Sequence, residues 1–191
     1  MNVSSAIQRR RTIRRFKNQA VPESMLIKFV DAARLAPSAG NSQPLEYITV
    51  ASASGCEKIF PHLKWARFIG GGDTPAEDKK PAAYIVVLIN RNIAAKGGGH
   101  ESGAAVQNIL LSAIEEGYGA CWLRSVDRAA IKEAFGIADH CDVDSVVALG
   151  KPAESPITEL AGDDTKYWRD DRGLLHVPKR SIDTILHKEK F

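Results

Sequence analysis

Three arginines and a threonine near the N-terminus form a group that could bind a phosphate. They lie in the run Arg10-Arg11-Thr12-Ile13-Arg14. Guanidinium groups bind phosphate through paired hydrogen bonds, and a threonine hydroxyl can donate a further one. We expect a helix from about residue 4 into this run, on which Arg10 and Arg14 would share a face. A solvated basic face or a nucleic-acid patch is the other interpretation, although only Phe16 could add an aromatic stack.

The charge distribution also points to an anion at this segment. The net charge is +3, and six of the 26 basic residues fall between Arg9 and Lys17. The rest of the chain, with 20 basic and 23 acidic residues, is mildly acidic. One basic segment on an acidic body is typical of a protein that binds an anion there.

A polar loop is the second group that could do chemistry. Between Pro37 and Pro44 the chain offers Ser38, Asn41 and Gln43. Hydroxyl and amide groups at fixed positions can meet the edge of a heteroaromatic ring that has both donors and acceptors. A plain polar turn is the alternative.

Two weaker candidates follow later in the chain. The first is the segment 117–123, with the sequence Gly-Tyr-Gly-Ala-Cys-Trp-Leu. It does not form a dinucleotide-binding fingerprint. Lys179 and Arg180 form a late basic pair that could meet the same phosphate as the N-terminal run.

The sequence contains no recognised motif for metal binding or for nucleophilic catalysis. His100-Glu101 lacks the second histidine of a zinc-protease motif, and His140-Cys141-Asp142 has no metal partner at ligand spacing. The three cysteines are far apart, so we expect free thiols and no metal.

Helices and strands must position these groups. Two of the expected elements are strongly apolar. Residues 82–90 are apolar enough for a strand covered on both faces, and helix 101–116 should be buried on most sides. We expect residues 52–81 to be irregular around the triple glycine 70–72. The other expected elements are a helix from Pro22 to before Pro37, strand 46–51, strand 119–125, a helix from Asp127 to Gly136, strand 143–150 and a short last helix over 180–190.

Four strands among at least four helices predict a single α+β domain over residues 1–191. No stretch has the roughly 20 apolar residues that a membrane span needs. The N-terminus does not read as a secretion signal, so we expect a cytoplasmic location.

In this order, the segments resemble the nitroreductase family of oxidoreductases that depend on flavin mononucleotide (FMN). Residues 10–16 look like its opening basic motif, and residues 37–44 are similar to its Pro-Ser-small-x-Asn-x-Gln-Pro loop, which is the most specific match. Residues 117–123 resemble the late strand that passes the flavin. Residues 150–152 and 178–180 look like the closing segments.

The resemblance implies a mostly antiparallel sheet flanked by helices, and a homodimer with two FMN sites at its interface. It implies that Arg10, Thr12 and Arg14 hold the phosphate and ribityl end, joined by Lys179 or Arg180. It places the loop around the partner's flavin and a backbone amide near Leu123 at flavin N5. The FMN-binding residues that it implies are Arg10, Arg11, Thr12, Arg14, Pro37, Ser38, Ala39, Asn41, Gln43, Leu123, Arg124, Lys179 and Arg180.

One residue departs from the family pattern. Arg124 stands where the family commonly has glycine. How closely this strand approaches the ring, and which amide meets N5, therefore depends on Arg124.

The reaction that the resemblance implies needs no catalytic side chain, because the flavin carries the chemistry. NADH or NADPH would reduce the flavin and leave, and a small electrophilic acceptor such as a nitroaromatic or a quinone would then take the hydride. Reductive dehalogenation, oxidative flavin breakdown and a nonenzymatic basic module that binds nucleic acid remain as alternatives.

Overall fold

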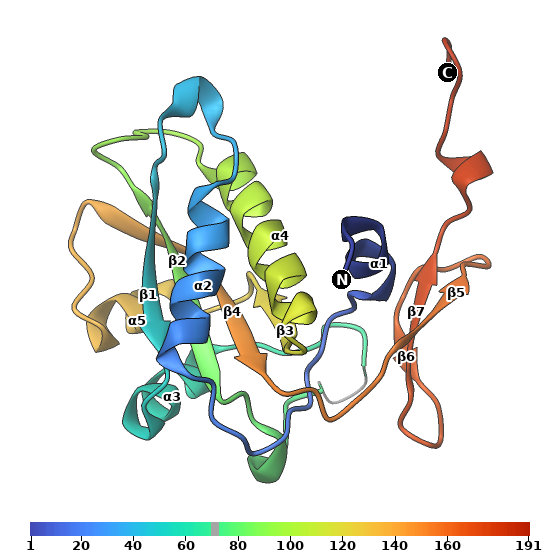
Figure 1. Cartoon of the computed structure of the whole chain (residues 1–191), viewed down its shortest axis with the longest axis horizontal. Coiled ribbons are helices and arrows are strands. Elements are labelled where there is room, and N and C mark those ends of the chain that lie inside the picture. The colour runs from blue at the N-terminus through green and yellow to red at the C-terminus, as the bar shows by residue number, and fades with distance from the viewer. Residues whose placement is uncertain (70–72) are drawn as a thin grey trace.

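A computed structural model describes residues 1–69 and 73–191. The triple glycine 70–72, expected to be irregular, lies outside the described residues. The central sheet has four antiparallel strands in the order β1-β2-β4-β3 (Figure 1), which confirms the predicted α+β fold with an antiparallel sheet. Its strands are β1 Leu45–Val50, β2 Ala83–Asn90, β3 Gly119–Leu123 and β4 Cys141–Gly150.

Helices cover both faces of this sheet (Figure 1). One core lies between the sheet and helices α2 (Glu23–Arg34) and α4 (Gly99–Glu115). The other core lies between the sheet and helices α3 (Ala53–Ile59) and α5 (Arg128–Ala134).

Strand β2 supplies both cores because successive side chains of a strand point to opposite faces. Ile85 and Val87 belong to the core under α2 and α4, while Tyr84 and Val86 belong to the opposite core. All eight residues of β2 are buried, which confirms the prediction of a strand covered on both faces.

The N-terminal helix is shorter than predicted. Helix α1 spans Val3–Arg9, and the chain then forms isolated bridges, including Thr12 with Ala120. The prediction that Arg10 and Arg14 share a helical face is therefore wrong. The local cause is close packing: a Cβ added at Gly119 would lie 2.7 Å from Ile13, so only glycine admits this approach.

Two segments contain elements that the sequence did not predict. Helix α3 lies within residues 52–81, and the Ser52 hydroxyl caps it by accepting a hydrogen bond from the Gly55 amide at 3.1 Å. The C-terminal part forms a second sheet in the order β5-β7-β6. Its strands are β5 Ile157–Leu160, β6 Trp168–Arg169 and β7 Leu175–Lys179.

The helix predicted over residues 180–190 is wrong. Only a single 3₁₀ turn forms there, at Ile182–Thr184, and the chain end extends away from the body (Figure 1). Ile185 and Leu186 are exposed, so no packed face supports a longer helix.

Helix α4 is less covered than predicted. One face, which includes Val106 and Ile109, is buried in the core under α2 and α4. On another side the helix carries what we call the outer stripe, whose members are exposed or partly exposed: Ala104, Gln107, Leu111 and Ile114. Within the described residues, no helix is both long and apolar enough to cross a membrane.

Candidate functional site

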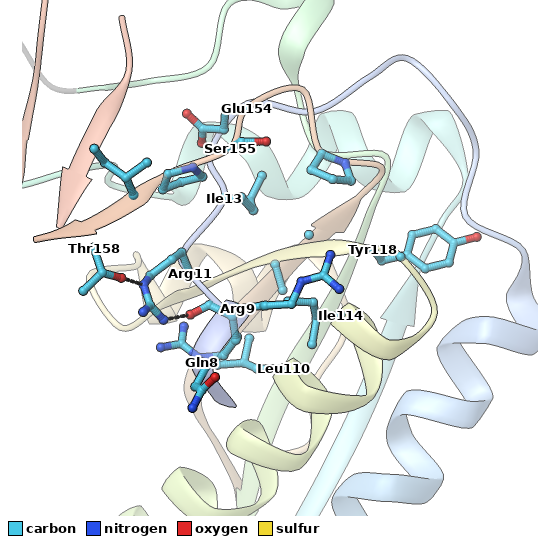
Figure 2. Close-up of a pocket in the computed structure, with 17 residues that line it drawn as sticks. Gln8, Arg9, Arg11, Ile13, Leu110, Ile114, Tyr118, Glu154, Ser155 and Thr158 are labelled. Atoms are coloured by element: carbon cyan, nitrogen blue, oxygen red, sulfur yellow. Dashed lines mark hydrogen bonds between the residues drawn. The ribbon is translucent and has the colours of Figure 1, made fainter. Parts of the chain in front are cut away.

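A cavity of about 600 Å³ opens where the end of α1 meets the last turns of α4, the start of β3 and the start of β5 (Figure 2). Arg9, Arg10 and Arg11 line it, together with apolar side chains such as Ile13 and Leu110. We call this cavity the basic pocket.

The arginines of the basic pocket have no acidic partner. Among the described residues, Arg9, Arg10 and Arg11 form no ion pair. Arg11 instead donates to the Thr158 hydroxyl and to the carbonyl oxygen of Arg10 (Figure 2). Burial and the neighbouring Arg11 charge lower the pKa of Arg10. Adjacent positive charges in a partly buried cavity favour an anionic ligand.

Glu154 lies in the wall of the pocket but is used elsewhere. Its Oε1 accepts hydrogen bonds from the backbone amides of Arg14 at 2.6 Å and Arg15 at 3.1 Å. Its Oε2 accepts from Arg169 Nη2 at 2.7 Å. The pocket therefore keeps its positive character in spite of this carboxylate.

Arg14 lies outside the basic pocket. Its side chain is buried, with 9% exposed, and its guanidinium carbon lies 4.7 Å from the centroid of the Tyr167 ring. Its Nε is buried and has no hydrogen-bond partner among residues 1–69 and 73–191. A buried donor without an acceptor costs free energy, so Arg14 is a group that an incoming acceptor would stabilise.

Other members of the predicted phosphate group are also separate from the pocket lining. Thr12 is partly buried at its bridge with Ala120. Lys179 ends β7, and Arg180 is exposed and donates to the carbonyl oxygen of Thr184 at 2.6 Å. Of the predicted phosphate residues, the structure thus brings Arg10 and Arg11 into one cavity.

The basic run is not a continuous solvated face. Arg14 is buried, and Arg15 pairs with Asp73 at 3.3 Å. Arg11 is bonded to Thr158. This geometry disfavours a nucleic-acid patch, which needs charges free to follow a phosphate backbone.

The loop over residues 37–44 has a defined shape. The Ser38 hydroxyl accepts a hydrogen bond from the Gln43 amide at 3.0 Å, and the Ala39 amide donates to Glu101 at 3.4 Å. Asn41 and Gln43 adopt positive φ angles of 54° and 49°. Such angles are uncommon outside glycine, so the hydrogen bonds hold the loop in an otherwise sparsely populated conformation.

This loop is also open to a ligand or a partner. Pro37, Ala39, Asn41 and Gln43 are all exposed. It contacts Glu101 in the first turn of α4, whereas the basic pocket contacts Ile114 in the last turn. At a rise of about 1.5 Å per residue, these two contacts are roughly 20 Å apart along the helix. One chain therefore does not bring its loop to its own basic pocket.

Arg124 follows the end of β3. Leu123 is buried and Arg124 is exposed, with its carbonyl oxygen accepting from Arg128 Nη2 at 3.1 Å. Asp127 caps α5 by accepting from the Ala130 amide at 3.1 Å. Among the described residues no ion pair joins Arg124 to Asp127.

Sequence reasoning missed three residues around the basic segment. Thr158, Glu154 and Tyr167 come from the C-terminal part, which carries no strong periodicity. Their roles depend on sheet pairing between distant segments. A local pattern does not reveal such pairing.

The sequence is similar to a known protein family and to known proteins. The sequence profile described as "Nitroreductase family" matches residues 7–151, and the chain therefore belongs to the nitroreductase family. A protein of Methanothermobacter thermautotrophicus, named "Putative NADH dehydrogenase/NAD(P)H nitroreductase", is 33% identical over 164 residues, which cover 83% of this chain and 81% of that protein. An Archaeoglobus fulgidus protein of the same name is 30% identical and covers 97% of this chain and 96% of its own.

Solved structures share the fold. A nitroreductase family protein from Clostridium difficile 630 has a TM-score of 0.73 at 18% identity, with both chains covered completely (100%). An FMN-dependent nitroreductase from Clostridium difficile R20291 has a TM-score of 0.66 at 21% identity, with 99% of this chain and 100% of that chain covered. These likenesses extend over the C-terminal sheet, which lies beyond the matched family profile.

Proposed function

We propose that this chain is an FMN-dependent oxidoreductase that passes a hydride from NADH or NADPH to a small electrophilic acceptor such as a nitroaromatic or a quinone. The observation that carries the proposal is the basic pocket. The chain belongs to the nitroreductase family, and the basic pocket contains arginines of the opening motif. These arginines have no ion-pair partner within the described part of the chain. The NAD(P)H nitroreductase names of two relatives and the FMN dependence of a protein with the same fold support it.

The chain's residues fit the phosphate and ribityl end of FMN. Arg10 and Arg11 in the pocket supply charge, and Thr12 supplies a hydroxyl beside them. Arg14 carries the buried Nε that has no acceptor. Either Lys179 or Arg180 would complete this group from the C-terminal sheet.

Bound FMN would supply the hydride chemistry, and the protein would position it. A backbone amide near Leu123 or Arg124 would donate to the ring nitrogen N5, and no side chain would be needed as acid or base. The donor and the acceptor would bind in turn, so the first product would have to leave before the acceptor binds.

We further propose that the working form is a homodimer. Pro37, Ser38, Ala39, Asn41 and Gln43 would contact the partner's flavin, because the loop is exposed and lies roughly 20 Å along α4 from its own basic pocket. The outer stripe of α4 leads from the loop end of the helix to the pocket. Its burial against a second copy would join the two halves of each site.

Reconstitution tests this proposal. The full-length protein is mixed with FMN, excess flavin is removed by gel filtration, and retained FMN is quantified by absorption. We expect about one FMN per chain and a dimer by light scattering. Protein that retains no FMN, or a monomer that retains it fully, would overturn the corresponding part.

A further inference from the structure

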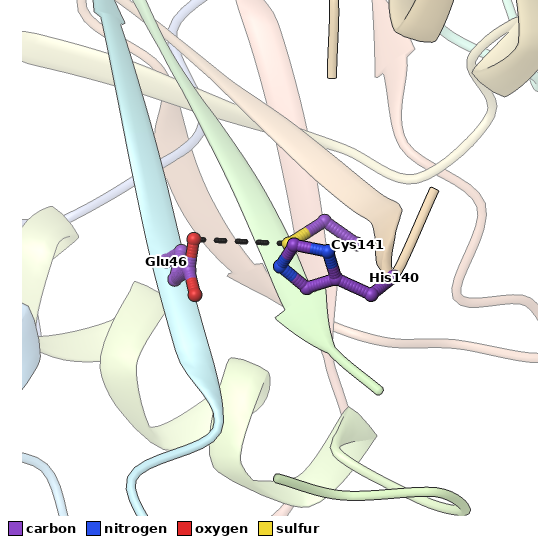
Figure 3. Close-up of side chains that lie close together, drawn as sticks. All are labelled: Glu46, His140 and Cys141. Carbon is purple, nitrogen blue, oxygen red and sulfur yellow. Dashed lines mark hydrogen bonds between the residues drawn. The ribbon is translucent and has the colours of Figure 1, made fainter. Parts of the chain in front are cut away.

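A cluster of three potential metal ligands lies at the opposite end of β4 from the basic pocket. Glu46 comes from β1, Cys141 begins β4, and His140 lies in the turn directly before it (Figure 3). One ligand atom of each residue lies within 4.8 Å of the others, and Cys141 Sγ is 3.7 Å from Glu46 Oε2. His140 and Cys141 are adjacent in sequence, but Glu46 is 95 residues before Cys141, so spacing along the chain could not reveal the cluster.

The spacing and the ligand types suit a tetrahedral ion. Zn²⁺ binds sulfur at about 2.3 Å and imidazole nitrogen or carboxylate oxygen at about 2.0–2.2 Å, so its ligands lie roughly 3–4 Å from one another. The observed separations are near this range, and small side-chain rotations would close them. Imidazole and thiolate favour zinc-like transition metals over Mg²⁺ or Ca²⁺.

Hydrogen bonds hold the side chain of Glu46 and the backbone at His140 and Cys141. Asn90 of β2 is buried, and its Nδ2 donates to Glu46 Oε1 at 2.5 Å. The carbonyl oxygen of His140 accepts from the Arg91 amide at 2.7 Å, and the Cys141 amide donates to the Ala138 carbonyl oxygen at 2.9 Å. Such outer contacts are typical of metal sites, where they orient the ligands.

The charges around the cluster leave room for a cation. Lys132 Nζ bonds to the carbonyl oxygens of Asp139 at 3.1 Å and Cys141 at 3.2 Å, and Arg91 pairs with Asp142 at 2.6 Å. Among the described residues, no basic group forms an ion pair with Glu46. A bound cation would compensate the negative charge of Glu46 and would attract the Cys141 thiolate.

We propose that Glu46, His140 and Cys141 bind one divalent transition metal ion of the zinc class. Glu46 and His140 are exposed, so an ion can enter from solvent, and a fourth position remains for water or an external ligand. Cys141 and Gly150 lie at opposite ends of β4, about 30 Å apart at roughly 3.3 Å per residue. The ion is therefore remote from the basic pocket.

The same ion would stabilise the end of the polar loop. Pro44 closes the loop two residues before Glu46, and its carbonyl oxygen accepts from the Asn90 amide at 2.8 Å. Asn90 also orients Glu46. Metal binding at Glu46 would thus fix the strand from which the loop emerges.

Cobalt is the probe for this site, because a thiolate bound to Co²⁺ gives a near-ultraviolet charge-transfer band. We titrate full-length protein with Co²⁺ and record difference spectra against the same sample before addition, so that any flavin absorption cancels. We expect the band to saturate at one Co²⁺ per chain and to fall when Zn²⁺ competes. A wild-type protein without this band would overturn the proposal.

Three variants assign the ligands. Cys141→Ser should abolish the band, and the matched Cys56→Ser should keep it, because Cys56 lies outside the cluster. His140→Asn, at an exposed position, should weaken binding about tenfold or more, and so should Glu46→Gln. A band that survives in Cys141→Ser, or wild-type affinity in folded His140→Asn, would contradict the assignment. Should Cys141→Ser fail to fold, His140→Asn decides.

Discussion

The guanidinium group of Arg14 lies over the ring of Tyr167, 4.7 Å from its centroid. A residue of the N-terminal motif is therefore covered by the residue that directly precedes β6. The adjacent Arg15 pairs with Asp73, which also binds Arg169 of β6. The basic segment and the C-terminal sheet consequently form one unit.

Arginine removal should weaken FMN binding. A charge-assisted contact to phosphate is worth roughly 1.5–3 kcal/mol, so Arg10→Ala and Arg14→Ala should each raise the FMN dissociation constant about tenfold or more. Quenching of FMN fluorescence measures it. Lys17→Ala is the matched control, because Lys17 is exposed at the end of the same basic segment.

The late basic residues are tested in the same assay. One of Lys179→Ala and Arg180→Ala should behave like Arg14→Ala and the other like Lys17→Ala. Unchanged affinity in both Arg14→Ala and Arg180→Ala would refute the phosphate assignment made here.

A charge on the outer stripe should break the dimer. Leu111→Arg places a cation in the middle of a surface that we expect to be buried, and obligate interfaces of this kind bury roughly 2,000 Å² or more. Light scattering should show a shift from dimer to monomer with loss of bound FMN. Ala53→Arg, at an exposed position on α3, should remain dimeric. A Leu111→Arg dimer that still holds FMN would contradict the proposed interface.

Arg124 should raise the flavin potential. If its side chain turns toward the ring, its positive charge favours the anionic reduced flavin over the neutral oxidised form. About 1.4 kcal/mol corresponds to roughly 30 mV for a two-electron couple. Arg124→Gly should therefore lower the midpoint potential by a few tens of millivolts, about 30 mV. FMN should stay bound.

The matched substitution Arg124→Gln separates charge from bulk, since it removes the cation and keeps a long side chain. Potentiometric titration should give it the same direction of shift as Arg124→Gly. Equal midpoints in all three proteins would mean that the exposed side chain points to solvent and that its charge has no influence on the flavin.

The buried ion cluster around Asp73 and Arg169 should contribute to the free energy of unfolding. The side chains of Asp73 and Arg169 are 8% and 9% exposed, and removing one partner of such a pair leaves a buried charge poorly compensated. Asp73→Asn should lower the free energy of unfolding by about 3 kcal/mol in urea titration. Asp164→Asn breaks the exposed pair with Lys166 and should cost under about 1 kcal/mol. Similar losses in both variants would argue against the buried cluster.

The central sheet was predictable because its signals are local. The apolar run of β2 and the helical spacing in α2 both appear within short windows. Asp127 and Gly136 mark the limits of α5, and Gly136 adopts a positive φ of 59°, as expected just beyond a helix end.

The missed elements depend on contacts between distant segments. The short strands β5 and β7 pair in parallel across residues 161–174, and their sequences show little alternation. The residues around 180–190 favour a helix locally, but no surface buries Ile185 or Leu186. The basic run leaves α1 at Arg9 because Ile13 packs closely on Gly119.

The candidate site was predictable only in part for the same reason. The motif residues Arg10 and Arg11 do reach one cavity, but the sequence does not show that Tyr167 covers Arg14 or that Glu154 binds its backbone. The approach of Glu46 to Cys141 likewise depends on the register of three strands. No spacing rule along the chain contains that information.

Separate half-reactions under anaerobic conditions test whether bound FMN takes a hydride from NADH or NADPH and passes it to an acceptor. FMN-loaded protein is mixed with one equivalent of NADH or NADPH and its absorption is recorded; a nitroaromatic or a quinone is then added without oxygen. We expect the flavin absorption to bleach with at least one donor and to return when the acceptor is added. A protein that binds no FMN, or whose bound flavin is reduced by neither donor, would contradict the proposed function.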